Sequence, residues 1–219
     1  MNFPKRRLAI IGSSAAIALS VALLVSRWVR PSLDVKPNEA VGQVLAEEAV
    51  RVLGGQGQVV LVTLDPSLSA AVKIQTDAFL AALKKTPSVT LAATERLQRA
   101  DVSGQDVQKE IPAARFLNVA QTYPQAAIVS LVGVPHLADS EIAKLPQPPP
   151  KLLAVVRSRK ALRELLESGR IQVAIVPRFA FPAPVGKPRR VREWFDKYFQ
   201  ILTSASDLPP STRSPIEGR

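Results

Sequence analysis

The sequence predicts an α/β protein in which a parallel sheet is covered by helices on both faces. Short apolar runs rich in β-branched residues alternate along the chain with segments whose apolar residues recur at helical spacing. Strands that alternate with helices imply right-handed crossovers, and these place helices on both faces of a parallel sheet. At 219 residues, 47% of them hydrophobic, the chain is long enough to bury such a core.

Five apolar runs have strand character. They are Val59–Leu64, Val89–Ala93, Ala127–Val132, Leu152–Val156 and Gln172–Val176. In the segments between these strands the apolar residues recur at helical spacing. These predicted helices are Leu68–Lys84, Gln105–Thr122 with a break at Pro112, Ala138–Lys144 and Ser158–Glu167.

A further helix is predicted before the first strand, over "EAVGQVLAEEAVRVL". Its apolar residues fall on one helical face, Asn38 is placed to cap its N-terminus, and "GGQG" ends it.

The N-terminus predicts a membrane anchor. Leu8 to Ser26 are nineteen consecutive uncharged residues, enough for a helix to cover most of a ~30 Å hydrocarbon layer. Three basic residues precede the run and two follow it, which favours a cytoplasmic N-terminus and a main domain outside the cytoplasm, in the periplasm of a bacterium. A cleaved signal peptide is the alternative, although "ALLVSRW" lacks a small-x-small cleavage site.

The predicted organisation therefore has four parts. Residues 1–30 form the transmembrane anchor, 31–37 a linker, 38–181 the α/β domain, and 182–219 a basic tail with an amphipathic helix at about 190–202. In that helix the apolar residues recur at i, i+3, i+4, i+7, i+8 and i+11. This stripe either packs on its own domain or contacts a partner, and the candidate partner-binding residues are Trp194, Phe195, Tyr198 and Phe199.

The net charge of +11 is concentrated at the two ends of the chain. Residues 31–150 hold ten basic and twelve acidic side chains, whereas residues 151–219 hold fourteen basic and six acidic ones. Other sequence features that are typical of nucleic-acid-binding proteins are absent, since no aromatic platform, zinc-finger spacing or helix-turn-helix occurs. Attraction to anionic lipid explains the basic ends more simply, and no nucleic-acid partner is expected.

The sequence does not predict an enzyme. Cysteine is absent and histidine occurs once, at His136, which excludes thiol catalysis and a multi-histidine metal centre. No P-loop, dinucleotide-binding glycine pattern or nucleophile elbow is present, and "GGQG" precedes a strand instead of following one. No cofactor and no metal is expected.

Four segments share one further pattern: "NEAVGQVLAEEAVRVLGGQGQVVLVTLDPSLSAAVKIQTDAFLAALKKTPSVTLAATERL", "YPQAAIVSLVG", "KLLAVVRSRKALRELLESGRIQVAIVPRF" and "REWFDKYFQIL". In this order they resemble one lobe of the type 1, ribose-binding-like family of periplasmic sugar-binding proteins. This resemblance implies the flavodoxin-like strand order 2-1-3-4-5 for the five-stranded sheet. It also implies that any ligand binds at the carboxyl ends of the strands.

Four residues at those strand ends are therefore candidate ligand-binding residues: Asp65, Ser67, Ser130 and Arg157. Ser67 also fits an ordinary helix N-cap, so the turn after the first strand is either part of a ligand site or only a corner. Family members usually place an acidic residue for sugar hydroxyls where this chain has Arg157. Together with Arg159 and Lys160, this cation would suit an anionic group better than a sugar.

The chain has length for one lobe, whereas the family closes two lobes around a solute. These features predict a non-catalytic, single-pass membrane protein that presents a periplasmic-binding-like lobe as an interaction or scaffold subunit of a membrane assembly. Its expected partners are the bilayer, other proteins of the complex or a second lobe. The alternative is a membrane-tethered solute-binding or sensing module related to the binding proteins of sugar ABC importers.

Overall fold

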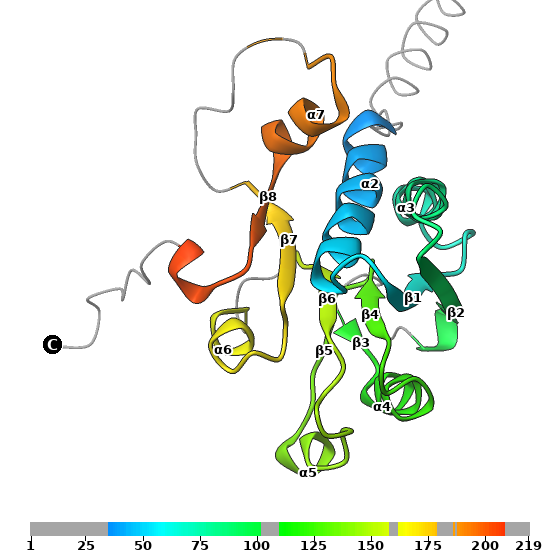
Figure 1. Cartoon of the computed structure of the whole chain (residues 1–219), viewed down its shortest axis with the longest axis vertical. Coiled ribbons are helices and arrows are strands. Elements are labelled where there is room, and N and C mark those ends of the chain that lie inside the picture. The colour runs from blue at the N-terminus through cyan, green and yellow to red at the C-terminus, as the bar shows by residue number, and fades with distance from the viewer. Residues whose placement is uncertain (1–34, 102–109, 158–161, 179–185, 187, 209–219) are drawn as a thin grey trace, which may run out of the picture. The chain divides into compact units, whose positions relative to one another are not determined.

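The computed structural model describes residues 35–101, 110–157, 162–178, 186 and 188–208 (Figure 1). The chain divides into two compact units, Met1–Asp34 and Val35–Arg219. The first unit holds the predicted anchor Leu8–Ser26 and lies outside the described residues. Among the residues that are described, no helix is both long and apolar enough to cross a bilayer.

The second unit alternates helices and strands as predicted. Its helices are α2 (Val35–Val52), α3 (Ala70–Leu83), α4 (Ala113–Thr122), α5 (Asp139–Ile142), α6 (Leu162–Glu167) and α7 (Val191–Tyr198), with single 3-10 turns at Arg99–Asp101 and Ala205–Asp207. Its strands are β1 (Gly57–Leu64), β2 (Val89–Leu97), β3 (Glu110–Ile111), β4 (Ala127–Ser130), β5 (Val134–Pro135), β6 (Leu152–Val155), β7 (Val173–Pro177) and β8 (Phe199–Leu202).

The main sheet has six strands in the order β2-β1-β4-β6-β7-β8. The five predicted strands are β1, β2, β4, β6 and β7; they pair in parallel and stand in the predicted order 2-1-3-4-5. The prediction of a sheet with five strands, all parallel, is wrong because β8 pairs antiparallel with β7. A second, two-stranded sheet joins β3 and β5.

The strand β8 also corrects the predicted helix over 190–202. The helix α7 ends at Tyr198, and Phe199 to Leu202 continue as a strand whose residues pair with those of β7. Apolar residues in "FQIL" fit either the helical stripe or a half-buried strand. The unpaired backbone groups along β7 decide between them, because a strand satisfies them and a helix does not.

A second correction concerns the predicted helix Gln105–Thr122. Glu110 and Ile111 form the strand β3, and the helix starts only at Ala113, after Pro112. Proline lacks the amide hydrogen that a helix interior needs, so the break at this residue is complete. Residues 105–109 of the predicted helix lie outside the described residues, as do Ser158 to Ala161 of the predicted helix Ser158–Glu167.

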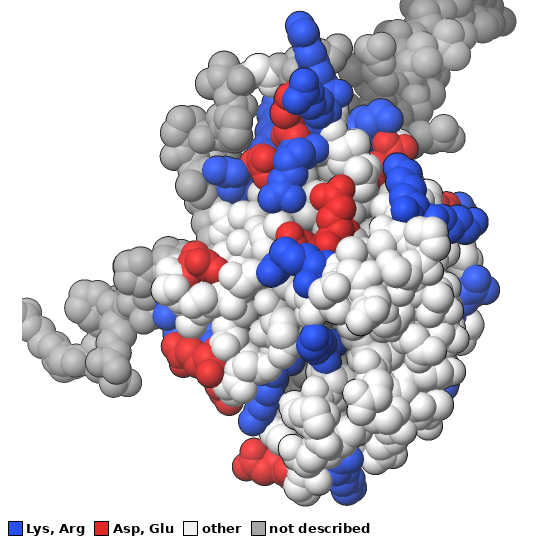
Figure 2. Space-filling view, in the orientation of Figure 1, with Lys and Arg blue, Asp and Glu red and all other residues white. Residues whose placement is uncertain are grey.

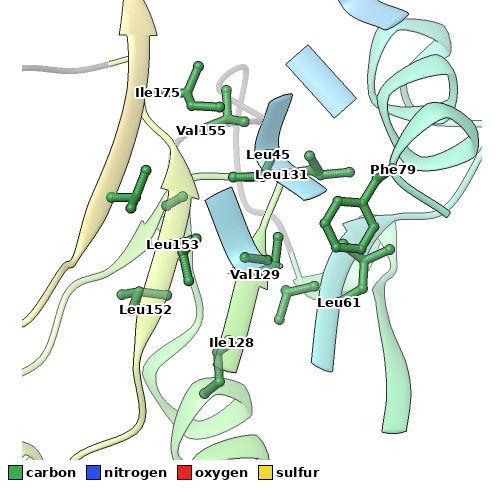
Figure 3. Close-up of a cluster of buried hydrophobic side chains, with 14 of the residues drawn as sticks. Leu45, Leu61, Phe79, Ile128, Val129, Leu131, Leu152, Leu153, Val155 and Ile175 are labelled. Carbon is green, nitrogen blue, oxygen red and sulfur yellow. The ribbon is translucent and has the colours of Figure 1, made fainter. Parts of the chain in front are cut away.

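The central strands are buried on both faces, which explains their continuous apolar sequences. Every residue of β4 and β6 is buried. Figure 3 shows Leu45 of α2 and Phe79 of α3 against Leu61 and Val129 of the sheet, whereas Ile128 lies beside α4. Right-handed crossovers produce this division, because α3 returns toward one side of β1 and the later helices run toward the other.

The helix α2 packs closely against α3 and also contacts α7. Gly42 permits the approach to α3, because a Cβ atom at this position would lie 2.2 Å from the carbonyl oxygen of Gln75. The amide of Gln75, buried between the two helices, donates to Oδ1 of Asn38 at 2.7 Å. Asn38 lies inside α2, so the prediction that it caps this helix is wrong.

Candidate functional site

The parallel strands end together on one side of the sheet, which we call its carboxyl end. In a doubly wound sheet this is where ligands usually bind. The chain leaves β1 at Asp65, β4 at Leu131, β6 at Val156 and β7 at Arg178. All four predicted ligand-binding residues lie in or beside these strand ends.

The turn after β1 is held by Asp65. One carboxylate oxygen accepts the backbone N–H of Ser67 at 2.9 Å and the Ser67 hydroxyl at 2.5 Å. These two hydrogen bonds, and to a smaller extent the charge of Arg96, lower the pKa of Asp65. The backbone N–H of Asp65 donates to the carbonyl of Leu97, which ties the turn to the end of β2. The side chains of Asp65 and Ser67 are therefore joined to each other.

The cap of α3 is Ser69, and the prediction that Ser67 caps this helix is wrong. The Ser69 hydroxyl accepts the backbone N–H of Val72 at 3.3 Å. Ser67 is occupied with Asp65, which leaves the second serine of "DPSLS" next to the first helical turn. The sequence signal for an N-cap is a serine about three residues before a backbone N–H of the first helical turn. Both Ser67 and Ser69 have this signal, so the sequence does not distinguish between them.

Ser130 is fully buried at the end of β4 and is not accessible to a ligand. It pairs with Val62 of β1 and Ala154 of β6, so it lies between two strands in the centre of the sheet. Its hydroxyl accepts the backbone N–H of Val132 at 3.2 Å. This bond satisfies the hydroxyl locally, as burial of a polar group requires. The assignment of Ser130 to a ligand site is therefore corrected.

Two guanidinium groups follow neighbouring strands at the carboxyl end. Arg157 comes after β6 and is exposed, although nearby atoms partly desolvate its guanidinium and lower its pKa. Arg178 comes after β7 and was not predicted as a site residue. It donates from its backbone to Tyr198 and from its guanidinium to the Asp196 carbonyl, while its Nε is buried without a hydrogen-bond partner in the described structure.

Arg178 could have been found from its place directly after an apolar strand, which is the same signal that identified Arg157. The two cations make this part of the sheet suited to an anionic group. Arg159 and Lys160, which would extend the set, lie outside the described residues.

The four aromatic residues predicted to bind a partner divide into buried and accessible ones. Phe195 is fully buried in the core and is not available to a partner, which corrects that assignment. Trp194 and Phe199 are partly buried, whereas Tyr198 is 39% exposed and stacks on Trp194 with ring centroids 6.3 Å apart. The stripe thus packs mainly on its own domain and leaves Tyr198 at the surface.

Basic side chains surround α7 and the beginning of α2, interspersed with acidic ones (Figure 2). Glu193 fixes the start of α7, since its carboxylate accepts the backbone N–H of Arg189 at 2.8 Å and of Arg190 at 3.4 Å. These hydrogen bonds lower the pKa of Glu193. The guanidinium of Arg192 lies 5.3 Å from the ring centre of Phe195.

No group of three or more histidine, aspartate or glutamate side chains that could hold a metal occurs among the described residues. His136 lies exposed in the segment between β5 and α5. The expectation that the protein holds no metal stays a prediction.

No protein-family model matches the chain, and no curated protein sequence matches it. Solved structures do match. A sugar-binding protein of a sugar ABC transporter from Bacillus halodurans superposes with a TM-score of 0.50 at 16% identity, over 76% of this chain and 62% of the other. GanP, a glucose-galactose binding protein from Geobacillus stearothermophilus, gives 0.50 at 14% identity, over 78% and 61%. The XylFII–LytSN complex gives 0.52 at 12% identity, over 78% and 61%.

The chain has the fold of one lobe of a periplasmic sugar-binding protein. The chain spans about 61 to 62% of the length of these three proteins. Identities of 12 to 16% establish the shared fold and not a shared ligand.

Proposed function

We propose that this protein is a membrane-anchored interaction subunit that uses a periplasmic-binding-like lobe to contact another protein. The anchor is Leu8–Ser26, the N-terminus is cytoplasmic, and the lobe lies on the periplasmic side of a bacterial inner membrane. The lobe performs no catalysis in this proposal. The main support for this proposal is the set of hydrogen bonds that the side chains form at the carboxyl end of the sheet.

Among the described residues at that end, two predicted ligand-binding side chains already hold hydrogen bonds within the chain. One carboxylate oxygen of Asp65 accepts two hydrogen bonds from Ser67, and Ser130 is buried and accepts the N–H of Val132. Arg157 and Arg178 also lie there, and cations do not replace the hydrogen-bond acceptors that a sugar needs.

The surface around α7 supports a protein partner. Val191 is 38% exposed and Tyr198 is 39% exposed, and basic residues surround them. Exposed apolar and tyrosine side chains beside arginines are typical of interface cores. A structure of the same fold, XylFII, has been solved in complex with LytSN, which fits the use of such a lobe for contact with another chain.

The proposal is tested by cross-linking in the native membrane. A photoreactive amino acid at Tyr198 should cross-link a specific partner protein, since this ring is at the surface of α7. The same residue placed at Thr90, exposed on β2 and distant in sequence from α7, is the matched control. Equal products from both positions, or no product from Tyr198, would contradict the proposal.

The topology is tested separately, and the absence of cysteine makes the experiment clean. Ser206 is exposed near the end of the described residues and can be replaced by a single cysteine. This cysteine should react with a membrane-impermeant maleimide that is added to spheroplasts with an intact inner membrane. Labelling only after lysis would show that the lobe is cytoplasmic. Release of the protein by alkaline carbonate would show that it is not anchored.

A solute-binding role is the second candidate. It is favoured by the Nε of Arg178, which is buried with no hydrogen-bond partner among the described residues and follows the strand next to the one that ends at Arg157. In that case a screen of sugars and organic anions should raise the melting temperature of the protein by mass action. The double variant Asp65→Ala, Arg157→Ala should abolish the shift. A shift that survives in this variant would place the solute elsewhere.

A further inference from the structure

A cavity of about 140 Å³ lies between α4, α6 and the segment that carries β5 and α5. Phe116, Leu152 and Leu165 contribute apolar side chains from three different elements, and Leu137 contributes another from the segment after β5. Three proline rings complete much of the wall, from Pro135, Pro149 and Pro150. Since the ring fixes φ, these parts of the wall are stiff before any ligand arrives.

The cavity is separate from the carboxyl end of the sheet. Leu152 is the first residue of β6, Pro150 and Pro149 lie two and three residues before it, and Arg170 precedes β7. These residues mark the amino ends of the strands, which are opposite the turn of Asp65. The site therefore depends neither on the proposed function nor on the ligand position usual in this fold.

The size and polarity of the cavity suit an apolar group better than a sugar. A cavity of ~150 Å³ holds a molecule the size of benzene, so 140 Å³ suits a compact group of that size. Most of the lining side chains are apolar, and His136, Glu164 and Arg170 are the lining residues that could hydrogen-bond the hydroxyls of a sugar. Burial of the remaining hydroxyls without partners is unfavourable. The cavity is suited to an apolar group.

A cation is available at the cavity. Arg170 is partly buried and lines it, and its backbone N–H donates to Leu165 at 3.0 Å. Within the described part of the chain, the guanidinium has no ion pair and no side-chain hydrogen bond. The exposed Glu164 also lines the cavity, but it forms no ion pair with Arg170. A partly desolvated guanidinium that lacks a partner pairs well with the two oxygens of a carboxylate.

We propose that this cavity binds a small apolar carboxylate, namely a branched aliphatic acid or a benzoate-like aromatic acid. The apolar group occupies the space between Phe116, Leu152 and Leu165, and the carboxylate pairs with Arg170. His136 also lines the cavity and is a second nitrogen side chain that can donate a hydrogen bond there.

The test is saturation-transfer NMR with the full-length protein in detergent micelles and benzoate as the probe. Saturable transfer is expected for benzoate and 3-methylbutanoate, and weaker or no transfer for benzyl alcohol, benzylamine and ribose. Arg170→Gln should weaken benzoate binding by about tenfold or more, since a hydrogen-bonded charge pair is lost. The matched control Arg99→Gln removes the same charge from the turn after β2 and should bind benzoate like the wild type.

Two further variants keep the test decisive. Leu137→Phe fills part of the cavity and should abolish the benzoate signal while the melting temperature is retained. The variant Asp65→Ala, Arg157→Ala should bind benzoate normally, which separates this site from the carboxyl end. Benzoate that gives no saturable signal, binds Arg170→Gln as well as the wild type, or binds no better than benzyl alcohol would overturn the proposal.

Discussion

The helices on the two faces of the sheet differ in how closely they pack. On one face α2 and α3 are 18 and 14 residues long, and they approach until only a hydrogen atom fits at Gly42. On the other face α5 has 4 residues, and α4 and α6 leave a cavity of about 140 Å³. The face of α2 and α3 also bears an open groove of about 410 Å³ beside Val191, so the two faces differ in the contact between their helices and not in total empty volume.

The difference follows from the connections between the strands. The crossover from β1 to β2 is a regular helix, whereas the crossover from β4 to β6 passes through β5, α5 and "LPQPPPK". Proline removes amide hydrogens and fixes φ, so this stretch cannot form the long helix that would cover the sheet. The contact at Gly42 therefore holds α2 tightly against α3, whereas the proline-rich connection leaves a cavity at the amino ends of the strands that has room for a small ligand.

The largest effect is expected from Phe195→Ala in α7, which packs with α2. Phe195 is fully buried, so truncation should lower the free energy of unfolding by about 3–5 kcal/mol. Chemical denaturation of the full-length protein measures the change. Tyr198→Ala, one turn later and 39% exposed, should cost less than about 1 kcal/mol. Equal losses would show that α7 is not docked through Phe195.

Gly42→Ala tests the close contact of α2 and α3. In an unhindered helix this change stabilises by about 1 kcal/mol, because alanine favours the helix. Here the added Cβ would lie 2.2 Å from the Gln75 oxygen, and we expect a destabilisation of about 1–3 kcal/mol instead. The sign of the change in a denaturation curve is decisive. Gln43→Ala, the next residue in α2, is the control and should stay within about 0.5 kcal/mol.

Beside the cavity of about 140 Å³, enlargement of a side chain should be tolerated. Leu137→Phe adds volume beside the cavity, and the free energy of unfolding should change by less than about 1 kcal/mol. Thermal denaturation without ligand measures it. A loss comparable to that of Gly42→Ala would mean that both faces are packed equally tightly.

The smallest effect concerns pH and the start of α7. The folded-state pKa of Glu193 is lowered, chiefly by the N–H groups of Arg189 and Arg190. Its contribution is therefore present above the unfolded pKa of ~4.3 and is lost as the pH falls through the folded value. Glu193→Gln should lower the melting temperature slightly at pH 7, and the difference from the wild type should vanish in acid. A difference that persists in acid would assign the loss to packing.

Much of the fold could be predicted because local pattern and burial agree. The runs "VVLVTL" and "AAIVS" are apolar apart from Thr63 and Ser130, and only a strand covered on both faces buries every side chain of such a run. The site was less predictable. Ser130 and Asp65 are polar residues at the carboxyl ends of strands, where ligand-binding residues usually lie. However, each forms a hydrogen bond to a residue two positions away, and the sequence does not show which of several neighbouring groups will form such a bond.

What the sequence by itself determined is the alternation of strands and helices, since periodicity distinguishes them. The order of the five parallel strands was implied by the resemblance to a periplasmic-binding lobe. Tertiary structure alone decided that Phe199 to Leu202 become a strand, because the free edge of β7 supplies their hydrogen bonds. It alone also decided that a cavity exists. A cavity forms where the side chains of α4, α6 and the segments between them leave space when they pack. These elements are distant in sequence, so no local sequence pattern predicts the cavity.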